Sequence, residues 1–255
     1  MEYITAKYTD VGTRKKTNQD SMVIMQAENG NRKVLMASVC DGMGGLAKGE
    51  LASATMVRSL SAWFEERLPR LLAKGFSPDD LWDEWQLLVD FTNRVIANYA
   101  ADNHTSLGTT AAVLLLVDNL YYWMNVGDSR IYLLSNTIQQ LTKDQTVVQR
   151  EIDAGRMTYE QSLVDPNRSM LLQCIGASPE VHPDFMSGVA MQGQEFMICC
   201  DGFRHVVLPE EFYRAFYPPQ MISTEIMEQR LKEITELNIQ RKEDDNISAI
   251  LIKLC

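Results

Sequence analysis

Short apolar segments recur along the chain, and their length and composition predict β-strands. They cover residues 34–39, 110–117, 120–126, 130–134, 195–200 and 247–253. Only Asp118 and Asn119 separate the second segment from the third, and such a two-residue connection is typical of a β-hairpin. Because the strands of a hairpin are antiparallel, the pattern favours an antiparallel sheet over a purely parallel one.

Residues 48–68 have the periodicity of an amphipathic helix. The predicted apolar face consists of residues four positions apart, namely Ala52, Met56, Leu60 and Phe64. Pro69 follows and is expected to end the helix, because proline cannot continue the backbone hydrogen bonding. Another helix is predicted over residues 224–237.

A longer helix is predicted over residues 77–101. Ser77 and Pro78 are suited to the N-cap and to the first helical position. The predicted apolar face consists of Leu81, Trp85, Leu88, Val95 and Tyr99. Strands and long helices occupy separate parts of the chain, so the predicted fold class is α+β.

The composition of the chain bears on its domain organisation and on its possible partners. The 255 residues contain no repeat and no Gly/Ser/Pro-rich linker, so we expect one domain over residues 1–255. Asp and Glu number 34 against 24 Lys and Arg, which gives a net charge of −10. Such a surface repels nucleic acid and anionic lipid, so we expect neither as a partner.

The cysteines and the chain start indicate a compartment. The five cysteines are scattered without a CxxC pair, which fits neither a disulfide framework nor a zinc site. The first residues lack a basic and apolar leader. The apolar run at residues 111–117 is far shorter than the roughly 20 residues that a membrane helix needs. We therefore expect a cytoplasmic protein.

Aspartates at the ends of predicted strands are the main chemical signal. Four such places carry Asp41-Gly42, Asp128-Ser129, Asp201-Gly202 and Asp244-Asp245-Asn246. A carboxylate at a buried strand end is costly unless it is paired or binds a metal ion. Each Asp-Gly alone is also typical of a simple turn, but four together favour a hard divalent cation such as Mg²⁺ or Mn²⁺.

Other chemistries lack their residues. The run Gly42-Met43-Gly44-Gly45 follows a predicted strand, but Ala47 stands where the third glycine of GxGxxG would fall. The chain has three His and neither HExxH nor GxSxG. Cys199 and Cys200 lie in an acidic stretch, which favours buried strand residues over a thiolate nucleophile.

Seven short blocks in order connect the chain with a known family. They are TDVGTRKKTNQD (9–20), VCDGMGG (39–45), GTTA (108–111), NVGDSR (125–130), LTKDQT (141–146), CDGF (200–203) and DNIS (245–248). In these blocks the chain resembles the metal-dependent serine/threonine protein phosphatases of the PP2C (PPM) type, in their compact bacterial form. The resemblance implies an αββα four-layer sandwich of two antiparallel sheets flanked by helices.

The resemblance also implies a metal centre with Mn²⁺ or Mg²⁺. Asp41 would bridge two ions, with the Gly42 carbonyl on one of them, and Asp201 and Asp245 would hold the other. Asp20 would act through waters, and a third, looser ion would use Asp128 together with Asp201. The catalytic set is thus Asp41, Asp201 and Asp245, which hold a metal-activated water that attacks phosphorus without a covalent intermediate.

The phosphate-binding residue departs from the family pattern. The family places an arginine three positions before the asparagine of the NQD block, where this chain has Lys15 preceded by Arg14. Either side chain could bind the phosphate, and the alternative is a solvated basic loop. His205, near Asp201, is interpreted as a surface or core histidine or as a proton donor.

Residues 144–178 correspond to the variable flap of the family and are expected to gate or select substrates. The implied function is hydrolysis of phosphoserine and phosphothreonine in proteins, in opposition to a Ser/Thr kinase, by a monomer. One alternative is an inactive relative that binds phosphoproteins. Another is a regulator-type phosphatase that acts on a phosphoserine in a small partner-switching protein.

Overall fold

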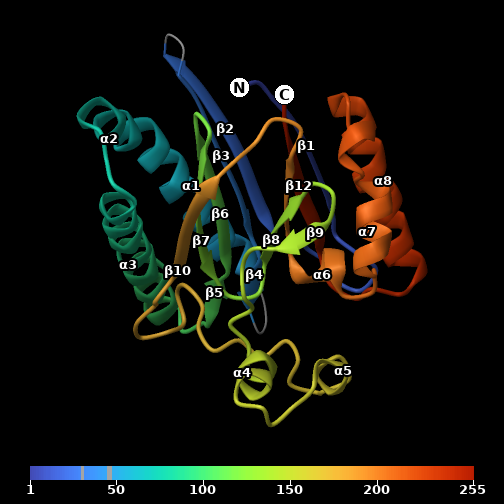
Figure 1. Cartoon of the computed structure of the whole chain (residues 1–255). Helices are drawn as coiled ribbons and strands as arrows, with labels where there is room; N and C mark the ends of the chain where they lie inside the picture. The colour runs from blue at the N-terminus through green and yellow to red at the C-terminus, as the bar shows by residue number, and fades with distance from the viewer. Residues whose placement is uncertain (30–31, 45–47) are drawn as a thin grey trace.

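The computed structural model describes residues 1–29, 32–44 and 48–255, and its centre is a pair of antiparallel sheets (Figure 1). One sheet has the order β1 (Tyr3–Asp10), β12 (Ile247–Leu254), β11 (Glu195–Cys199), β8 (Arg130–Leu134) and β9 (Ile138–Gln140). The other has the order β10 (Asp184–Val189), β7 (Leu120–Val126), β6 (Ala111–Val117), β3 (Arg32–Cys40) and β2 (Ser21–Asn29). Two short strands, β4 (Gly42–Gly44) and β5 (Leu107–Thr109), form a separate two-stranded sheet.

Helices cover the outer faces of the two sheets (Figure 1). The helices α1 (Gly49–Glu66), α2 (Leu68–Lys74) and α3 (Pro78–Asp102) lie on the side of the β10-to-β2 sheet. The opposite side carries α6 (Asp201–Arg204), α7 (Pro209–Ala215), the 3-10 turn Pro218–Gln220 and α8 (Thr224–Gln240). The predicted α+β class and the αββα sandwich are confirmed. None of the described helices has the length and apolar character needed to span a membrane.

The central strands are buried on both faces. In β3, Leu35 and Ala37 belong to the core between the sheets, whereas Met36 packs with the α1 and α3 side chains. Successive residues of a strand point to opposite faces, so a strand covered on both sides is apolar throughout. This explains the unbroken apolar run at residues 34–39.

The predicted hairpin is confirmed, because Val117 pairs with Leu120 across the two-residue connection. The structure also contains strands that were not predicted, namely β1, β2, β4, β5, β9 and β10. The expected role of Pro69 was wrong in part. The first helix does end at Glu66, but Pro69 then stands in the first turn of α2.

The N-terminus of α3 is as predicted, and its apolar face is partly different. Ser77 caps the helix and accepts a hydrogen bond from the Asp80 amide. Leu81 and Trp85 are buried, but Val95 is 40% exposed, and Val89 and Ile96 continue the buried face instead. Val95 lies ten residues after Trp85. At 3.6 residues per turn, its direction around the helix axis differs from that of Trp85 by about 80°, so Val95 points away from the buried face.

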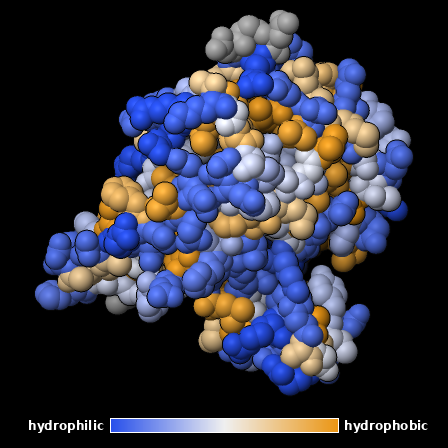
Figure 2. Space-filling model, turned by 60° about the vertical axis from the view of Figure 1, so that its left-hand side comes forward, coloured by the Kyte–Doolittle hydropathy of each residue, from blue (hydrophilic) through white to orange (hydrophobic). Residues whose placement is uncertain are grey.

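Residues 144–178 project beyond one end of the sandwich. They contain α4 (Val147–Asp153) and α5 (Tyr159–Ser162), drawn at the bottom of Figure 1. The lower lobe in Figure 2 is this flap, with hydrophobic residues exposed among hydrophilic ones. Its two ends are attached to the body, since the Gln145 amide donates to the Gly127 carbonyl and Ile175 pairs with Thr109.

Candidate active site

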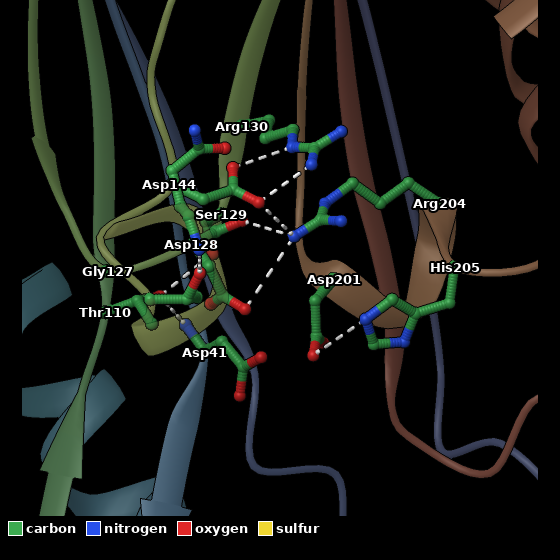
Figure 3. Close-up of polar contacts among 12 residues, drawn as sticks. Asp41, Thr110, Gly127, Asp128, Ser129, Arg130, Asp144, Asp201, Arg204 and His205 are labelled. Carbon is green, nitrogen blue, oxygen red and sulfur yellow. Dashed lines mark hydrogen bonds and ion pairs between the residues drawn. The ribbon is translucent and has the colours of Figure 1, made fainter. Parts of the chain in front are cut away.

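Acidic residues from both sheets meet at one end of the sandwich. Asp41 follows β3, Asp128 follows β7, and Asp201 opens α6 directly after β11. In Figure 3 the side chains of these three residues extend toward a shared space. Burial raises the pKa of Asp41 well above its ordinary value, and the negative charges of Asp20, Asp201, Asp128 and Asp245 raise it further. The other four predicted metal-site aspartates therefore lie close enough to Asp41 to raise its pKa.

The backbone of Asp41 is fixed by the threonine that ends β5 and the one that follows it. The Asp41 amide donates to Thr110 Oγ1 at 2.9 Å, and the Thr110 amide donates to the Asp41 carbonyl at 2.9 Å. Thr109 Oγ1 donates to the same carbonyl at 3.0 Å. Thr110 Oγ1 also lies 2.9 Å from Ser129 Oγ, beside Asp128. This chain of contacts couples the positions of Asp41 and Asp128.

Gly42 lies where three segments touch. A Cβ atom at Gly42 would lie 2.2 Å from the carbonyl oxygen of Gly49 and 2.4 Å from that of Gln19. The Gly42 amide also donates to the Gln19 carbonyl at 3.1 Å. This packing leaves no room for a side chain and holds the predicted carbonyl ligand in place. Gly45 and Ala47, the end of the glycine-rich run, lie outside the described residues.

The turn that carries Asp245 is held between two further glycines. A Cβ atom at Gly12, where φ is +75°, would lie 2.2 Å from the Asp245 carbonyl oxygen. A Cβ atom at Gly202 would lie 2.2 Å from the Asn246 carbonyl oxygen. The Asn246 side chain donates to the Val11 carbonyl at 2.9 Å and accepts from the Gln19 amide at 2.9 Å. Contacts between distant parts of the sequence therefore set the position of Asp245.

Several carboxylate oxygens at the site are buried without a partner. Both side-chain oxygens of Asp20 and Oδ1 of Asp201 have no hydrogen bond among the described residues. Burial raises the pKa of Asp20 to about 7; the nearby Ser248 and Cys200 side chains act to lower it, although neither is within hydrogen-bonding geometry of its oxygens, and the charges of Asp201 and Asp245 add to the rise. Orphaned buried acceptors are costly and need a compensating partner.

These carboxylates suit a hard divalent cation. Carboxylate and carbonyl oxygens are the ligands that Mg²⁺ and Mn²⁺ prefer. Among residues 1–29, 32–44 and 48–255, no group of three or more Asp, Glu, His or Cys side chains is arranged so that it could already hold a metal ion. The residues present thus fit the expected ions by their chemistry and by their unpartnered oxygens.

The structure distinguishes Lys15 from Arg14. Lys15 Nζ lies 3.0 Å from Asp245 Oδ1. Burial acts to lower the pKa of Lys15, but Asp245, Asp41 and Asp201 outweigh it, so the pKa is raised. Arg14 instead pairs with Asp244 at 2.8 Å and is 75% exposed. Of the two predicted phosphate-binding residues, Lys15 is the one paired with a predicted metal-site aspartate.

His205 lies between two acidic side chains. Its Nε2 is 3.4 Å from Asp201 Oδ2, and its Nδ1 is 3.7 Å from Glu243 Oε1 (Figure 3 shows the first contact). Burial acts to lower the pKa of His205, but Glu243 and Asp201 outweigh it and the pKa is raised. His205 is therefore neither a surface residue nor part of the apolar core.

A buried ion-pair network surrounds Asp128 (Figure 3). Arg204 Nη2 donates to the Asp128 carbonyl at 2.9 Å and to Asp144 Oδ2 at 3.2 Å, and it lies 3.7 Å from Asp128 Oδ2. Arg130 binds Asp144 through two hydrogen bonds of 2.7 Å. Burial and the charge of Asp201 raise the pKa of Asp128 to about 7, while Arg204 lowers it.

The adjacent cysteines are structural, as interpreted from the sequence. Cys199 and Cys200 are fully buried. Burial raises the pKa of the Cys199 thiol to about 12, so it is not a thiolate near neutral pH. Cys200 Sγ accepts a hydrogen bond from the Ser248 amide at 3.1 Å and thereby joins β11 to β12.

Several residues that shape the site were not assigned a role from the sequence. Thr110, Ser129, Asp144 and Asn246 occur in the seven blocks, but their residue types do not reveal contacts with segments far along the chain. Arg204 carried no signal beyond its position three residues after Asp201.

Comparisons with known proteins agree with this geometry. The protein phosphatase 2C family profile matches residues 12–236. "Protein phosphatase PhpP" of Streptococcus pneumoniae is 28% identical over 206 residues, which is 80% of each chain. The crystal structure of the Mycobacterium tuberculosis serine/threonine phosphatase PstP/Ppp has a TM-score of 0.81 at 27% identity and covers 99% of this chain and 98% of its own.

A further structure shows the catalytic domain of the serine/threonine protein phosphatase PstP in complex with two manganese ions. Its TM-score is 0.78 at 25% identity, with 99% of this chain and 98% of that chain covered. The match of the family profile extends over most of the sequence and includes six of the seven sequence blocks in part or in full. The chain belongs to the protein phosphatase 2C family.

Proposed function

We propose that this phosphatase hydrolyses phosphoserine and phosphothreonine in proteins with divalent cations held by the strand-end carboxylates. The observation that carries the proposal is the burial of Asp41 among four other aspartates whose charges act on it, together with the unpartnered buried oxygens of Asp20 and Asp201. Membership of the phosphatase family and the serine/threonine phosphatase relatives support the same chemistry.

In the proposed centre, Asp41, the Gly42 carbonyl, Asp201 and Asp245 hold two ions, and Asp20 acts through waters. The manganese complex of PstP supports this number. Bound Mn²⁺ or Mg²⁺ supplies an activated water and offsets negative charge on the phosphoryl group. Asp128 is not part of this set, because Arg204 already lies beside it.

Lys15 is proposed to bind the phosphate of the substrate. Its ammonium group is the nearest described basic group to Asp245 and feels the charges of Asp41 and Asp201. A lysine contributes a point charge rather than the two-pronged contact of an arginine. It therefore attracts the phosphate by its charge without fixing the orientation of the phosphate.

The protein segments that carry phosphoserine or phosphothreonine are proposed to contact the flap of residues 144–178. Its exposed apolar side chains include Tyr159, Leu163 and Val164. A single domain over residues 1–255 is supported by the core that the two sheets share. Opposition to a Ser/Thr kinase, a monomeric state and a cytoplasmic location stay predictions from the sequence.

The test uses adjacent aspartates with different surroundings. Phosphate release from phosphoserine, phosphothreonine and phosphotyrosine peptides is measured with Mn²⁺, with Mg²⁺ and with excess EDTA. We expect turnover of the first two peptides only, with loss in EDTA. Asp245→Asn removes a proposed ligand and abolishes turnover, whereas Asp244→Asn, whose side chain pairs with Arg14 outside the centre, retains it.

Two outcomes contradict the proposal. Turnover that persists in EDTA would exclude the metal-dependent mechanism. A folded protein that binds phosphopeptides but releases no phosphate with either ion would instead support the phosphoprotein-binding alternative.

A further inference from the structure

Arg204 is a buried cation at the edge of the proposed metal centre. Its side chain is 10% exposed. One nitrogen, Nη2, contacts the Asp128 carbonyl and Asp144 Oδ2 and lies 3.7 Å from Asp128 Oδ2. Figure 3 shows the guanidinium reaching from α6 toward both carboxylates. Arg204 therefore offsets part of the negative charge that is buried at Asp128 and Asp144.

Charge is balanced differently on the two sides of the site. Around Asp128, the two carboxylates of Asp128 and Asp144 face the two guanidinium groups of Arg204 and Arg130. The other side carries more negative charge: among the described residues, Lys15 and His205 are the basic groups paired with the set Asp20, Asp41, Asp201, Asp245 and Glu243. Divalent cations are thus needed most beside Asp20, Asp41 and Asp245, whereas beside Asp128 the Arg204 guanidinium offsets part of the negative charge of Asp201 and Asp144.

We infer that Arg204 is a positioning residue that takes the place of a third divalent cation beside Asp128. An ion bound to Asp128 would lie close to the guanidinium and be repelled by it. Displacing Arg204 would break its contacts with Asp128 and Asp144 and leave its charge buried. This chain therefore holds two ions, and the third ion expected from the family resemblance does not fit its residues. The inference rests on the proposed function.

Binding stoichiometry tests the inference directly. Mn²⁺ binding to the full chain is measured by isothermal titration calorimetry for the wild type, Arg204→Gln, Arg204→Lys and the double variant Arg204→Gln/Asp128→Asn. We expect two ions for the wild type and three for Arg204→Gln, because removal of the guanidinium frees Asp128. Arg204→Lys restores two ions because it keeps the charge, and the double variant returns to two.

A matched control removes an arginine elsewhere. Arg241 pairs with Glu211 outside the centre, and Arg241→Gln changes the net charge by the same amount. It is expected to bind two ions, which separates the local effect of Arg204 from a general change in charge. Circular dichroism checks that each variant is folded.

The possible results separate the two proposals. Three ions in the wild type, or two in a folded Arg204→Gln variant, would overturn the role of Arg204 and leave the proposed phosphatase function standing. No binding by the wild type would overturn the proposed function and this inference with it. If Arg204→Gln does not fold, the wild type and Asp128→Asn decide: two ions in both support the inference, and a loss of one ion in Asp128→Asn contradicts it.

Discussion

The carboxylate centre and the flap lie side by side and are built in opposite ways. At the centre, the missing Cβ positions of Gly42 and Gly202 lie 2.2 Å from neighbouring backbone atoms, and Thr110 holds Asp41 from both sides. In the flap, a Cβ at Gly155 would meet nothing within 4 Å, and Val164 is 81% exposed. The centre has almost no freedom to shift, whereas most of the flap surface is free.

This difference matches two different requirements. Oxygen ligands act on a cation only at defined distances, so the centre needs a backbone fixed by many contacts. A segment that meets varied protein substrates needs exposed side chains and few constraints. Asp144 stands at the boundary, because it opens the flap and yet belongs to the buried network with Arg130 and Arg204.

The largest expected effect is the loss of stability in Asp144→Asn, at the boundary between the centre and the flap. The variant leaves two buried guanidinium groups without their shared carboxylate, and we expect a loss of about 3–5 kcal/mol in the free energy of unfolding at neutral pH. Asp153→Asn, in the exposed part of the flap, is the control and should change stability far less. Urea unfolding measures both.

The same variant has a defined pH dependence. Burial acts to raise the pKa of Asp144, but Arg204 and Arg130 outweigh it and hold the pKa below the ordinary value of 3.8. A carboxyl whose pKa is lowered by folding stabilises the protein above that ordinary value and loses its effect as pH falls through the folded pKa. The difference in the free energy of unfolding between the wild type and Asp144→Asn should therefore become smaller below about pH 4. A difference in stability that stays constant down to about pH 3 would contradict the lowered pKa of Asp144.

A pair of glycine variants compares the two regions directly. Gly42→Ala places a methyl group against the backbone of Gly49 and Gln19, which shifts the carbonyl ligand and should lower kcat/KM about 100-fold. Gly155→Ala meets open space, so its cost is limited to backbone strain at φ +68°. We expect its kcat/KM for p-nitrophenyl phosphate to stay near that of the wild type. Equal losses in both variants would remove the distinction between the regions.

Lys15→Ala tests which basic side chain binds the phosphate. Loss of a charged hydrogen bond to the substrate should raise KM about tenfold, with a smaller change in kcat. Arg14→Ala serves as the control, because Arg14 pairs with Asp244 and points to solvent. Steady-state kinetics with a phosphothreonine peptide would contradict the assignment if Arg14→Ala had the larger effect.

The smallest effect is expected on the exposed face of the flap. Replacing Leu163 and Val164 with serine should change kcat/KM for phosphopeptides by roughly threefold, since partly exposed apolar contacts contribute about 1 kcal/mol or less. Hydrolysis of p-nitrophenyl phosphate, which has no peptide segment to contact these residues, should not change. A parallel loss on both substrates would show that the flap supports the centre rather than protein recognition.

The sequence predicted those parts that depend on local pattern. The hairpin at Asp118 and Asn119, the capped start of α3 and the buried face of α1 follow from turn chemistry and periodicity. The strand β1 was missed because Lys7 and Thr9 interrupt its apolar character, and β10 because of Asp184 and Gly188. Such edge strands are defined by their partners more than by their own residues.

The site shows the same limit. The strand-end aspartates could be recognised because residue type and neighbouring glycine indicate their chemistry. The roles of Thr110 and Arg204 depend on contacts with residues 69 and 76 positions away along the chain. Only the packing of the two sheets brings these residues together, so no local pattern could reveal them.

The central claim is that the strand-end carboxylates drive phosphomonoester hydrolysis through bound divalent ions. The most direct measurement is hydrolysis of p-nitrophenyl phosphate by the wild type and by Asp201→Asn, each with Mn²⁺ and with excess EDTA. The account predicts turnover only for the wild type with Mn²⁺. Turnover by a folded Asp201→Asn variant at the wild-type rate, or by the wild type in EDTA, would contradict it.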